Sequence, residues 1–197
     1  LILVSSNYRA LIALPGMLFA AAHVKNDIPS VLNEFSLDNP DVELHFAREL
    51  AVSLKLVNAA ASRIEDALGE ADKNVEITRK DTLLMVVGRG ASDPDANSNV
   101  TKITRFLWEG LDLGWAETSY SGVAVPLIAD GLDYAAMLGF KRIVVFPYFL
   151  FSGILVTRIY DAADAANAKY PDIDIIKAGY LNDHPQVLDT FIERMNE

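Results

Sequence analysis

Cysteine is absent from this 197-residue sequence, and histidine occurs only three times. The lack of cysteine excludes disulfide bonds, cysteine-ligated zinc and cysteine-held iron–sulfur clusters. Basic residues are also scarce: 17 lysines and arginines against 27 acidic residues give a net charge of −10. This balance argues against nucleic acid as a partner, because phosphate binding relies on clustered lysine and arginine.

Long apolar runs are missing as well. None reaches the ~18 residues of a membrane span, and no charged-then-apolar leader opens the sequence. The apolar share of 51% and the charged share of 22% are typical of a globular protein that buries a core. We therefore expect a cytoplasmic protein without a membrane partner, present as a monomer or a weak homodimer.

The sequence contains an internal repeat. Residues 39–64 resemble residues 170–195 at a spacing of 131 positions, and residues 9–24 resemble residues 141–156 at a spacing of 132. One inserted residue reconciles the two spacings. The chain therefore consists of two halves with the same pattern.

Each half alternates strands with helices. Residues 82–88, TLLMVVG, are a continuous apolar run ended by glycine, which is typical of a strand buried on both faces, and residues 99–111 follow with helical spacing. Such alternation implies parallel sheets. The sequence predicts an α/β fold of two similar halves, residues 1–76 and 77–197. Each is expected to be a parallel sheet of about four strands flanked by helices, the two facing each other across a cleft. One continuous doubly wound sheet is the alternative.

The beginning of the sequence departs from the repeat. LILVS, residues 1–5, resembles MVVG, residues 85–88, at a spacing of 83, whereas the spacing is 132 from residue 9 onward. The difference is 49 residues of the repeat, which we expect to be absent around residues 5–7, in the half that bears the active site. A tight hairpin through SSNY is the alternative, but this junction has no turn glycine.

His23 stands where an apolar strand gives way to the start of a helix. In open α/β sheets this end of a strand is where ligands bind. Three alanines precede His23 and are small enough for a flat ligand to lie against the backbone. After it, Lys25 supplies a cation, and we expect Asp27 to cap a helix with Pro29 in its first turn, so that N–H groups face anions. A purely structural histidine is the alternative.

Two motifs, LPGMLFAAAHVKNDIP at residues 14–29 and VVGRGASDPDANSNV at residues 86–100, together resemble the signature of the CbiX-type class II chelatases, the sirohydrochlorin chelatases, in their long form with two fused halves. The similarity covers nearly the whole chain. It implies that His23 is both a catalytic residue and a metal ligand. It also implies that the preceding segment binds the tetrapyrrole, through Leu18, Phe19, Ala20, Ala21 and Ala22. We expect Lys25 and Arg48 to meet carboxylates of the substrate, with a surface ion pair as the alternative for Arg48.

The resemblance also separates the two halves. The first histidine of the family, a metal ligand and proton acceptor, should follow the strand at residues 1–4, where the repeat is interrupted. In the second half Arg89 and Leu155 match the two histidines, and Gly122 stands where a glutamate is expected. We interpret the second half as a degenerate site that serves as wall and scaffold.

The resemblance implies a lyase that inserts Co²⁺, or Fe²⁺ or Ni²⁺, into a sirohydrochlorin-like tetrapyrrole in cobalamin or siroheme biosynthesis. The divalent metal is then a substrate, and no tightly bound cofactor is expected. Neutral imidazole suits these ions and leaves positions open for ring nitrogens, and histidine can accept a pyrrole proton near neutral pH. A non-catalytic tetrapyrrole or metal carrier derived from a chelatase is the alternative. A periplasmic-type small-ligand binder is a third interpretation.

We expect structural roles for the remaining candidate residues. His45 alternates outward on a strand, and His184 lies in the cap of the last helix. GRGASD, residues 88–93, follows a strand but lacks the full pattern of a phosphate-binding loop. YFLF, residues 148–151, is interpreted as core and cleft wall.

Overall fold

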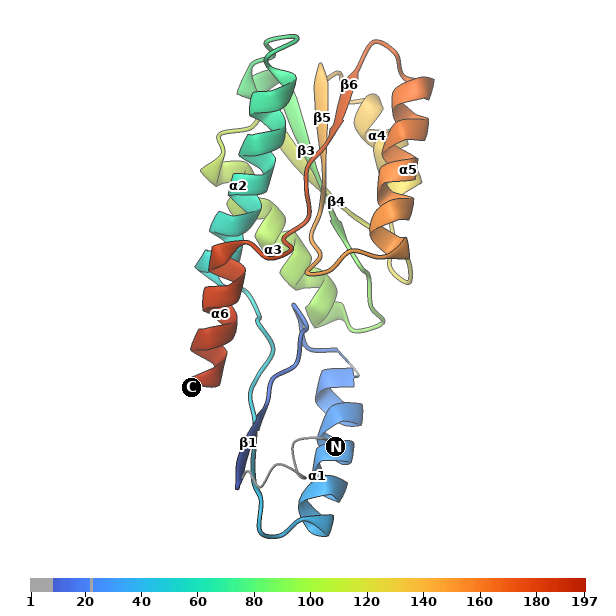
Figure 1. The fold of residues 1–197 in the computed structure, drawn as a ribbon. Coiled ribbons are helices and arrows are strands. Elements are labelled where there is room, and N and C mark those ends of the chain that lie inside the picture. Colours follow the sequence, from blue (N-terminus) through green and yellow to red (C-terminus); the bar gives the residue numbers. More distant parts are fainter. Residues whose placement is uncertain (1–8, 22) are drawn as a thin grey trace.

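The computed structural model of the chain describes residues 9–21 and 23–197, with the backbone alone described at residues 23 and 24. The molecule is elongated, with a larger C-terminal lobe at the top of Figure 1 and a smaller N-terminal lobe below it. The N-terminal lobe comprises residues 9–51 and the C-terminal lobe residues 54–182. The last helix extends from the C-terminal lobe down the side of the N-terminal lobe.

The C-terminal lobe is built on a sheet of four parallel strands in the order β4–β3–β5–β6. The strands are β3 (Thr82–Gly88), β4 (Trp115–Tyr120), β5 (Arg142–Pro147) and β6 (Asp174–Lys177). The two central strands, β3 and β5, are buried along their whole length. This burial agrees with the continuous apolar run from which the first of them was predicted.

Helices cover both faces of this sheet (Figure 1). They are α2 (Leu54–Ala71) and α3 (Pro94–Gly110) on one face, and α4 (Ile128–Ala136) and α5 (Ile154–Lys169) on the other. A short 3₁₀ turn, η3 (Arg79–Asp81), leads into β3. Successive residues of β3 and β5 alternate between two apolar cores, one under each helical layer. The predicted α/β class, with parallel strands flanked by helices, is confirmed. Within residues 9–21 and 23–197, none of the helices has both the length and the hydrophobicity of a membrane span.

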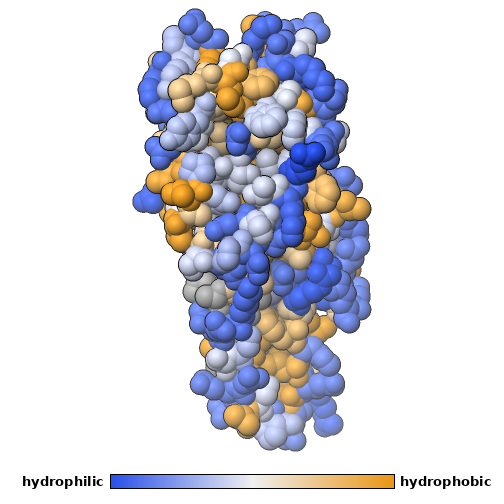
Figure 2. Space-filling model, turned by 180° about the vertical axis from the view of Figure 1, so that it is seen from behind, coloured by the Kyte–Doolittle hydropathy of each residue, from blue (hydrophilic) through white to orange (hydrophobic). Residues whose placement is uncertain are grey.

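The N-terminal lobe is thinner. Its elements are β1 (Ala10–Ala13), the π-helical turn η2 (His23–Asp27), α1 (Ile28–Asp38) and β2 (Glu43–Phe46), and the two strands are parallel. The described residues of this half thus form two strands, fewer than the four that we predicted. α1 has no buried residue, and Val31 is 64% exposed. Apolar side chains reach the surface at this end of the molecule (Figure 2). The lobe therefore has little core of its own.

The repeat in the sequence is also present in the structure. Ala10 is the register partner of Glu43 in the N-terminal sheet, as Arg142 is of Asp174 in the C-terminal sheet. These residues stand at the spacings of 132 and 131 found in the sequence. The arrangement in two halves is thereby confirmed. The interruption expected at residues 5–7 lies outside the described residues, and the boundary between residues 76 and 77 stays a prediction.

One helix crosses between the halves in space. α2 belongs to the first half by sequence, yet it packs against β5, β6 and α3 of the C-terminal lobe. Its counterpart in the repeat, α6 (Pro185–Met195), lies along α2. Near the end of α6, Arg194 donates to the carbonyls of Glu49 at 3.1 Å and Leu50 at 2.8 Å. The two helices therefore fix the lobes to each other.

Arg142, at the start of β5, fastens the end of α2 to the sheet. Its side chain is fully buried, forms ion pairs with Asp72 and Asp174, and donates to the carbonyl of Val75 at 2.9 Å. The hydrogen bond from Arg142 holds the pKa of the Asp72 carboxyl below its ordinary value. A buried guanidinium is tolerated because these partners satisfy it, and removing it would leave them unpaired.

Candidate functional site

A cavity of about 490 Å³ lies where the two lobes meet. The N-terminal lobe contributes the loop after β1, and the C-terminal lobe contributes the loops after β3 and β5 with the first turns of α3 and α5. The lining residues are 16–19, 21, 88–91, 96, 97, 100 and 148–156. These loops follow the carboxyl ends of parallel strands, where open α/β sheets bind ligands, and the volume is that of a small-molecule site.

The loop after β3 is fixed by close backbone contacts. Gly90 has a φ of 83°, and a Cβ at this position would lie 1.9 Å from the carbonyl oxygen of Gly122, so glycine is required. The side chain of Asn97 donates to the carbonyl of Ala91 at 2.8 Å and accepts from its amide at 3.0 Å. The loop therefore holds the backbone of Arg89 in one position on the cavity wall.

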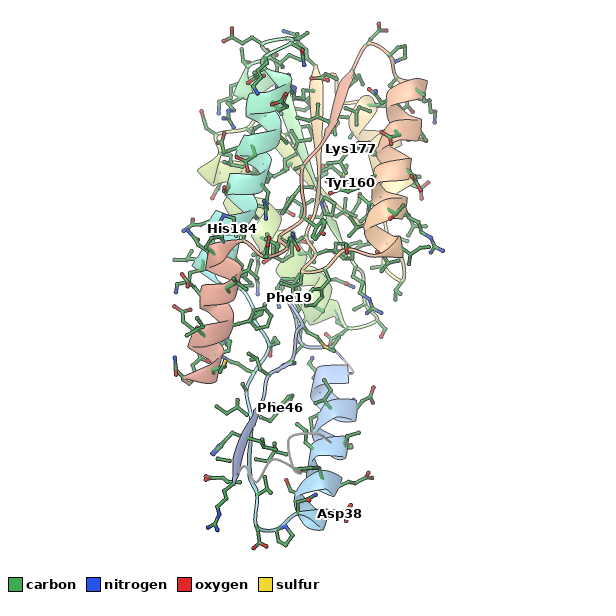
Figure 3. All side chains as sticks on the ribbon, in the orientation of Figure 1. Phe19, Asp38, Phe46, Tyr160, Lys177 and His184 are labelled. Carbon is green, nitrogen blue, oxygen red and sulfur yellow. The ribbon has the colours of Figure 1, made fainter. Side chains whose placement is uncertain are left out.

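Tyr148 joins the two lobes at the cavity. Its side chain is buried, and its ring stacks on that of Phe19, with centroids 5.9 Å apart and 22° between the planes. Figure 3 shows Phe19 at the junction of the lobes, below the C-terminal sheet. The Tyr148 hydroxyl is buried without a hydrogen-bond partner among the described residues, and burial raises its pKa. Aromatic faces from both halves thus form part of the wall.

α5 begins at the cavity. Its N-cap is Gly153, which has no side chain to accept from the first N–H groups of the helix. The first-turn residues 154–156 line the cavity. Among them, Leu155 is half-buried. It forms part of the wall, as expected from the interpretation of the second half.

Three of the five residues predicted to contact the tetrapyrrole line this cavity: Leu18, Phe19 and Ala21. Ala20 is half-buried and is not part of the lining. Ala22 and the side chain of His23 lie outside the described residues. The segment that the sequence singled out therefore faces the cavity over most of its described length.

The backbone of His23 is positioned by the start of a helix. The amide of Lys25 donates to the carbonyl of Ala21 at 2.9 Å, and at the matching positions of the second half the amide of Thr157 donates to the carbonyl of Gly153 at 3.1 Å. η2 therefore begins in the same way as α5. His23 occupies the backbone position whose C-terminal counterpart lines the cavity.

Lys25 connects the two lobes beside the cavity. Its Nζ lies 2.5 Å from a carboxylate oxygen of Asp93 and 3.9 Å from one of Asp95. Asp93 is the N-cap of α3, and the hydrogen bond from Lys25 holds the pKa of its carboxyl below the ordinary value. Lys25 is thus engaged in an ion pair and is not part of the lining.

The capping role predicted for Asp27 is wrong. Its backbone is helical, with φ of −68° and ψ of −49°, and its side chain makes no capping hydrogen bond. The reason is that the turn η2 precedes α1, so Asp27 already lies inside a helical segment. Pro29 does stand in the first turn of α1, as predicted.

The other predicted side chains lie away from the cavity. Arg48 donates two hydrogen bonds to Glu197, at 2.5 and 2.8 Å, which is the ion pair considered as its alternative role. His45 is exposed on β2. The Nδ1 atom of His184 accepts from the amide of Gln186 at 3.3 Å, at the start of α6 (Figure 3). Both histidines therefore have the positions that the sequence predicts.

The sequence model of the family described as CbiX matches residues 2–67 and 83–197. The chain belongs to the CbiX family. The resemblance carried by the two motifs is thereby confirmed.

Two curated relatives are similar to this CbiX chain over most of its length. The chain is 35% identical to the sirohydrochlorin cobaltochelatase of Priestia megaterium over 98% of its own length and 62% of that protein. It is 29% identical to the sirohydrochlorin ferrochelatase of Priestia megaterium over 86% of its own length and 60% of that protein. The chain thus spans about three fifths of these two relatives.

Among solved structures, SirB from Bacillus subtilis with Fe³⁺ has a similar fold. The TM-score is 0.80 at 23% identity, and the match covers 98% of this chain and 73% of that one. At this identity the similarity speaks for the fold alone. It agrees with the α/β architecture described above.

Four polar residues of the described cavity wall were not predicted as site residues of this CbiX chain: Arg89, Asn97, Tyr148 and Ser152. Arg89 was assigned to a degenerate half, and Tyr148 to a stretch of core and wall. A signal for both was available, because each follows the end of a strand in the repeat, the place from which the residues of the first half were chosen. The structure shows that such ends from both halves line one cavity.

Proposed function

We propose that this chain acts as a chelatase that inserts Co²⁺ or Fe²⁺ into sirohydrochlorin, with the metal ion as a substrate. The observation that carries the proposal is the 35% identity to a sirohydrochlorin cobaltochelatase over 98% of the chain, in a member of the CbiX family. Cobalt is placed first because the relative named for cobalt is more similar than the one named for iron, which is 29% identical.

The cavity suits a flat ligand with apolar ring faces and charged groups at its edge. Most of its described wall is apolar, with contributions from Leu18 and Phe19 of one lobe and Leu155 of the other. Such walls are suited to the two faces of a macrocycle, whose area they remove from water. The backbone N–H groups at the start of α5 favour anionic groups at the ring edge.

His23 is proposed as the catalytic residue and metal ligand. Metal insertion requires a loosely held divalent ion and the removal of two pyrrole N–H protons. A neutral imidazole can bind Co²⁺ or Fe²⁺ while leaving positions for ring nitrogens, and it can accept a proton near neutral pH. The support from the structure is the backbone position of this residue, two residues beyond Ala21 in the cavity lining.

A multiple-turnover assay with sirohydrochlorin and Co²⁺ tests the proposal, with His23→Ala and the matched control His45→Ala. Wild type and His45→Ala are expected to shift the absorption of the macrocycle over many turnovers. His23→Ala is expected to lose about 10²-fold in rate or more, the scale of a positioned acid–base group. Thermal melts should coincide for all three proteins.

Two outcomes contradict the proposal. Normal turnover by His23→Ala would remove this residue from the chemistry. A wild-type protein that changes the spectrum only up to one equivalent would be a tetrapyrrole or metal carrier.

A further inference from the structure

Arg89 is the only charged residue among the described residues that line the cavity. Its side chain is exposed and makes no hydrogen bond or ion pair with another described residue. The nearby cation Lys25 differs, because Asp93 already pairs with it. In a chain of net charge −10, a guanidinium beside the cavity that has no partner among the described residues is a local positive charge that can hold an anionic group.

The loop fixes the backbone of Arg89 more firmly than a surface position requires. The hydroxyl of Ser121 donates to the carbonyl of Arg89 at 3.0 Å, and the amide of Ser121 donates to the carbonyl of Gly88 at 2.9 Å. The next residue, Gly90, lies against the backbone of Gly122. A guanidinium that starts from a fixed backbone loses less freedom when it binds a ligand.

We infer that Arg89 orients the substrate by binding a peripheral carboxylate of the tetrapyrrole. This inference rests on the proposed function. Apolar walls hold the faces of a macrocycle but leave it free to rotate in its own plane, whereas a charged contact at the rim favours the orientations that bring a carboxylate to it. Guanidinium pairs with carboxylate through two parallel hydrogen bonds. A guanidinium carries hydrogen-bond donors and no acceptor, so Arg89 can bind and position the substrate but takes no proton from it.

The test compares wild type, Arg89→Gln, Arg89→Lys and the control Lys141→Gln. Lys141 is an exposed cation at the opposite end of the same sheet, so its loss changes the net charge equally. Binding of metal-free sirohydrochlorin is measured by fluorescence titration at low and high salt, and insertion of Co²⁺ is measured as kcat and KM. Arg89 lies outside the core, so all four proteins are expected to melt together.

Arg89→Gln is expected to weaken tetrapyrrole binding and to raise KM by about tenfold, the scale of a hydrogen-bonded contact to a charged group. Its kcat should stay within about twofold of wild type, and its binding should depend less on salt because one ionic contact is gone. Arg89→Lys should bind more tightly than Arg89→Gln, because lysine keeps the positive charge but cannot form the two parallel hydrogen bonds of a guanidinium. Lys141→Gln should behave as wild type.

The inference is overturned if Arg89→Gln matches Lys141→Gln in affinity and salt dependence, or if kcat falls while affinity is unchanged. Failure of the proposed function gives a different result. If the wild-type protein binds sirohydrochlorin but inserts no metal, the proposed chelatase activity is wrong. The binding titration would still test whether Arg89 contacts the tetrapyrrole. A wild-type protein that does not bind it would sink both.

Discussion

The two halves carry one sequence pattern, yet they bury it to very different extents. Val144 in β5 is fully buried, whereas Ile12, its counterpart in β1, is 49% exposed. β5 lies between β3 and β6 and has helices over both faces. Among the described residues, β1 pairs only with β2. The sequence pattern therefore determines which segments form strands and helices. Whether a strand is buried depends on how many strands and helices pack against it.

The half with the smaller core carries the side chain that is proposed for the chemistry. The well-packed half presents Arg89 and Leu155 at the cavity, whereas the thin half carries His23 at the matching turn. We interpret the C-terminal lobe as the rigid wall against which the ligand lies. The N-terminal lobe then supplies the residue proposed for chemistry. This comparison makes four further predictions, from the largest expected effect to the smallest.

The largest effect is expected for Arg142→Ala, because this buried guanidinium joins α2 to the sheet and its counterpart in the first half is Ala10. Removing this buried guanidinium leaves a cavity and takes the partner from the carbonyl of Val75 and from two partly exposed carboxylates, and we expect a loss of about 3 kcal/mol in the free energy of unfolding. Urea denaturation measures it. Lys141→Ala, the exposed neighbour, should change stability by less than about 0.5 kcal/mol. Equal losses in the two variants would show that the burial of Arg142 and its ion pairs add nothing to stability beyond the loss of a surface charge.

The second prediction compares the counterparts Val144 and Ile12 directly. Val144→Ala removes a fully buried side chain and should cost about 2–3 kcal/mol. Ile12→Ala removes a larger side chain, but one that is half exposed, and should cost less than about 1 kcal/mol. Denaturation midpoints of both variants give the ratio. A larger loss at Ile12 would mean that the N-terminal strand is covered in solution.

The third prediction concerns Leu155, the counterpart of His23. Leu155→Ala enlarges the cavity on one side and should raise KM for sirohydrochlorin about threefold to fivefold, through lost apolar contact. Its kcat should stay near that of wild type, since leucine takes no part in proton or metal transfer. Steady-state kinetics with Co²⁺ separate the two constants. If Leu155→Ala lost most of its kcat while His23→Ala turned over normally, the chemistry would belong to the C-terminal half, and the assignment to His23 would be wrong.

Much of this fold could be predicted because it depends on local pattern. TLLMVVG became β3 with the predicted bounds, and the repeat predicted two similar halves, in which the pairs Ala10–Glu43 and Arg142–Asp174 stand at matching positions. Leu18, Phe19 and Ala21 were expected near the ligand because the segment resembles the chelatase signature, and they line the cavity. The expectation that a ligand binds at strand ends, by contrast, needs only the sequence spacing and the rules of parallel sheets.

The rest depends on contacts between distant segments. The apolar face of α2 predicts that the helix packs on a sheet, but nothing in that face says that the sheet is the one of the other half. The partner of Lys25 is 68 residues away in the sequence, and that of Arg48 is 149 residues away. Asp27 failed as a cap because the helical segment begins four residues earlier, at His23.

The smallest effect concerns pH and belongs to the C-terminal lobe alone. The hydrogen bond from Arg142 lowers the pKa of Asp72 in the folded protein, whereas an unfolded aspartate titrates near ~3.9. The carboxylate therefore contributes its full stabilisation above about pH 4, and this is lost as the pH falls through the lower, folded pKa. The difference in unfolding free energy between wild type and Asp72→Asn should be constant near neutrality and shrink in acid. In an Arg142→Met background the same comparison should show a weaker pH dependence, because the largest cause of the lowered pKa is gone while the amide of Ile77 and the charge of Arg79 remain. Because Asp72 remains 36% exposed, solvent screens the pair and the change should be small. A difference that persists unchanged through the acid range, or a pH dependence that is equally large in the Arg142→Met background, would show that Arg142 does not hold this end of α2.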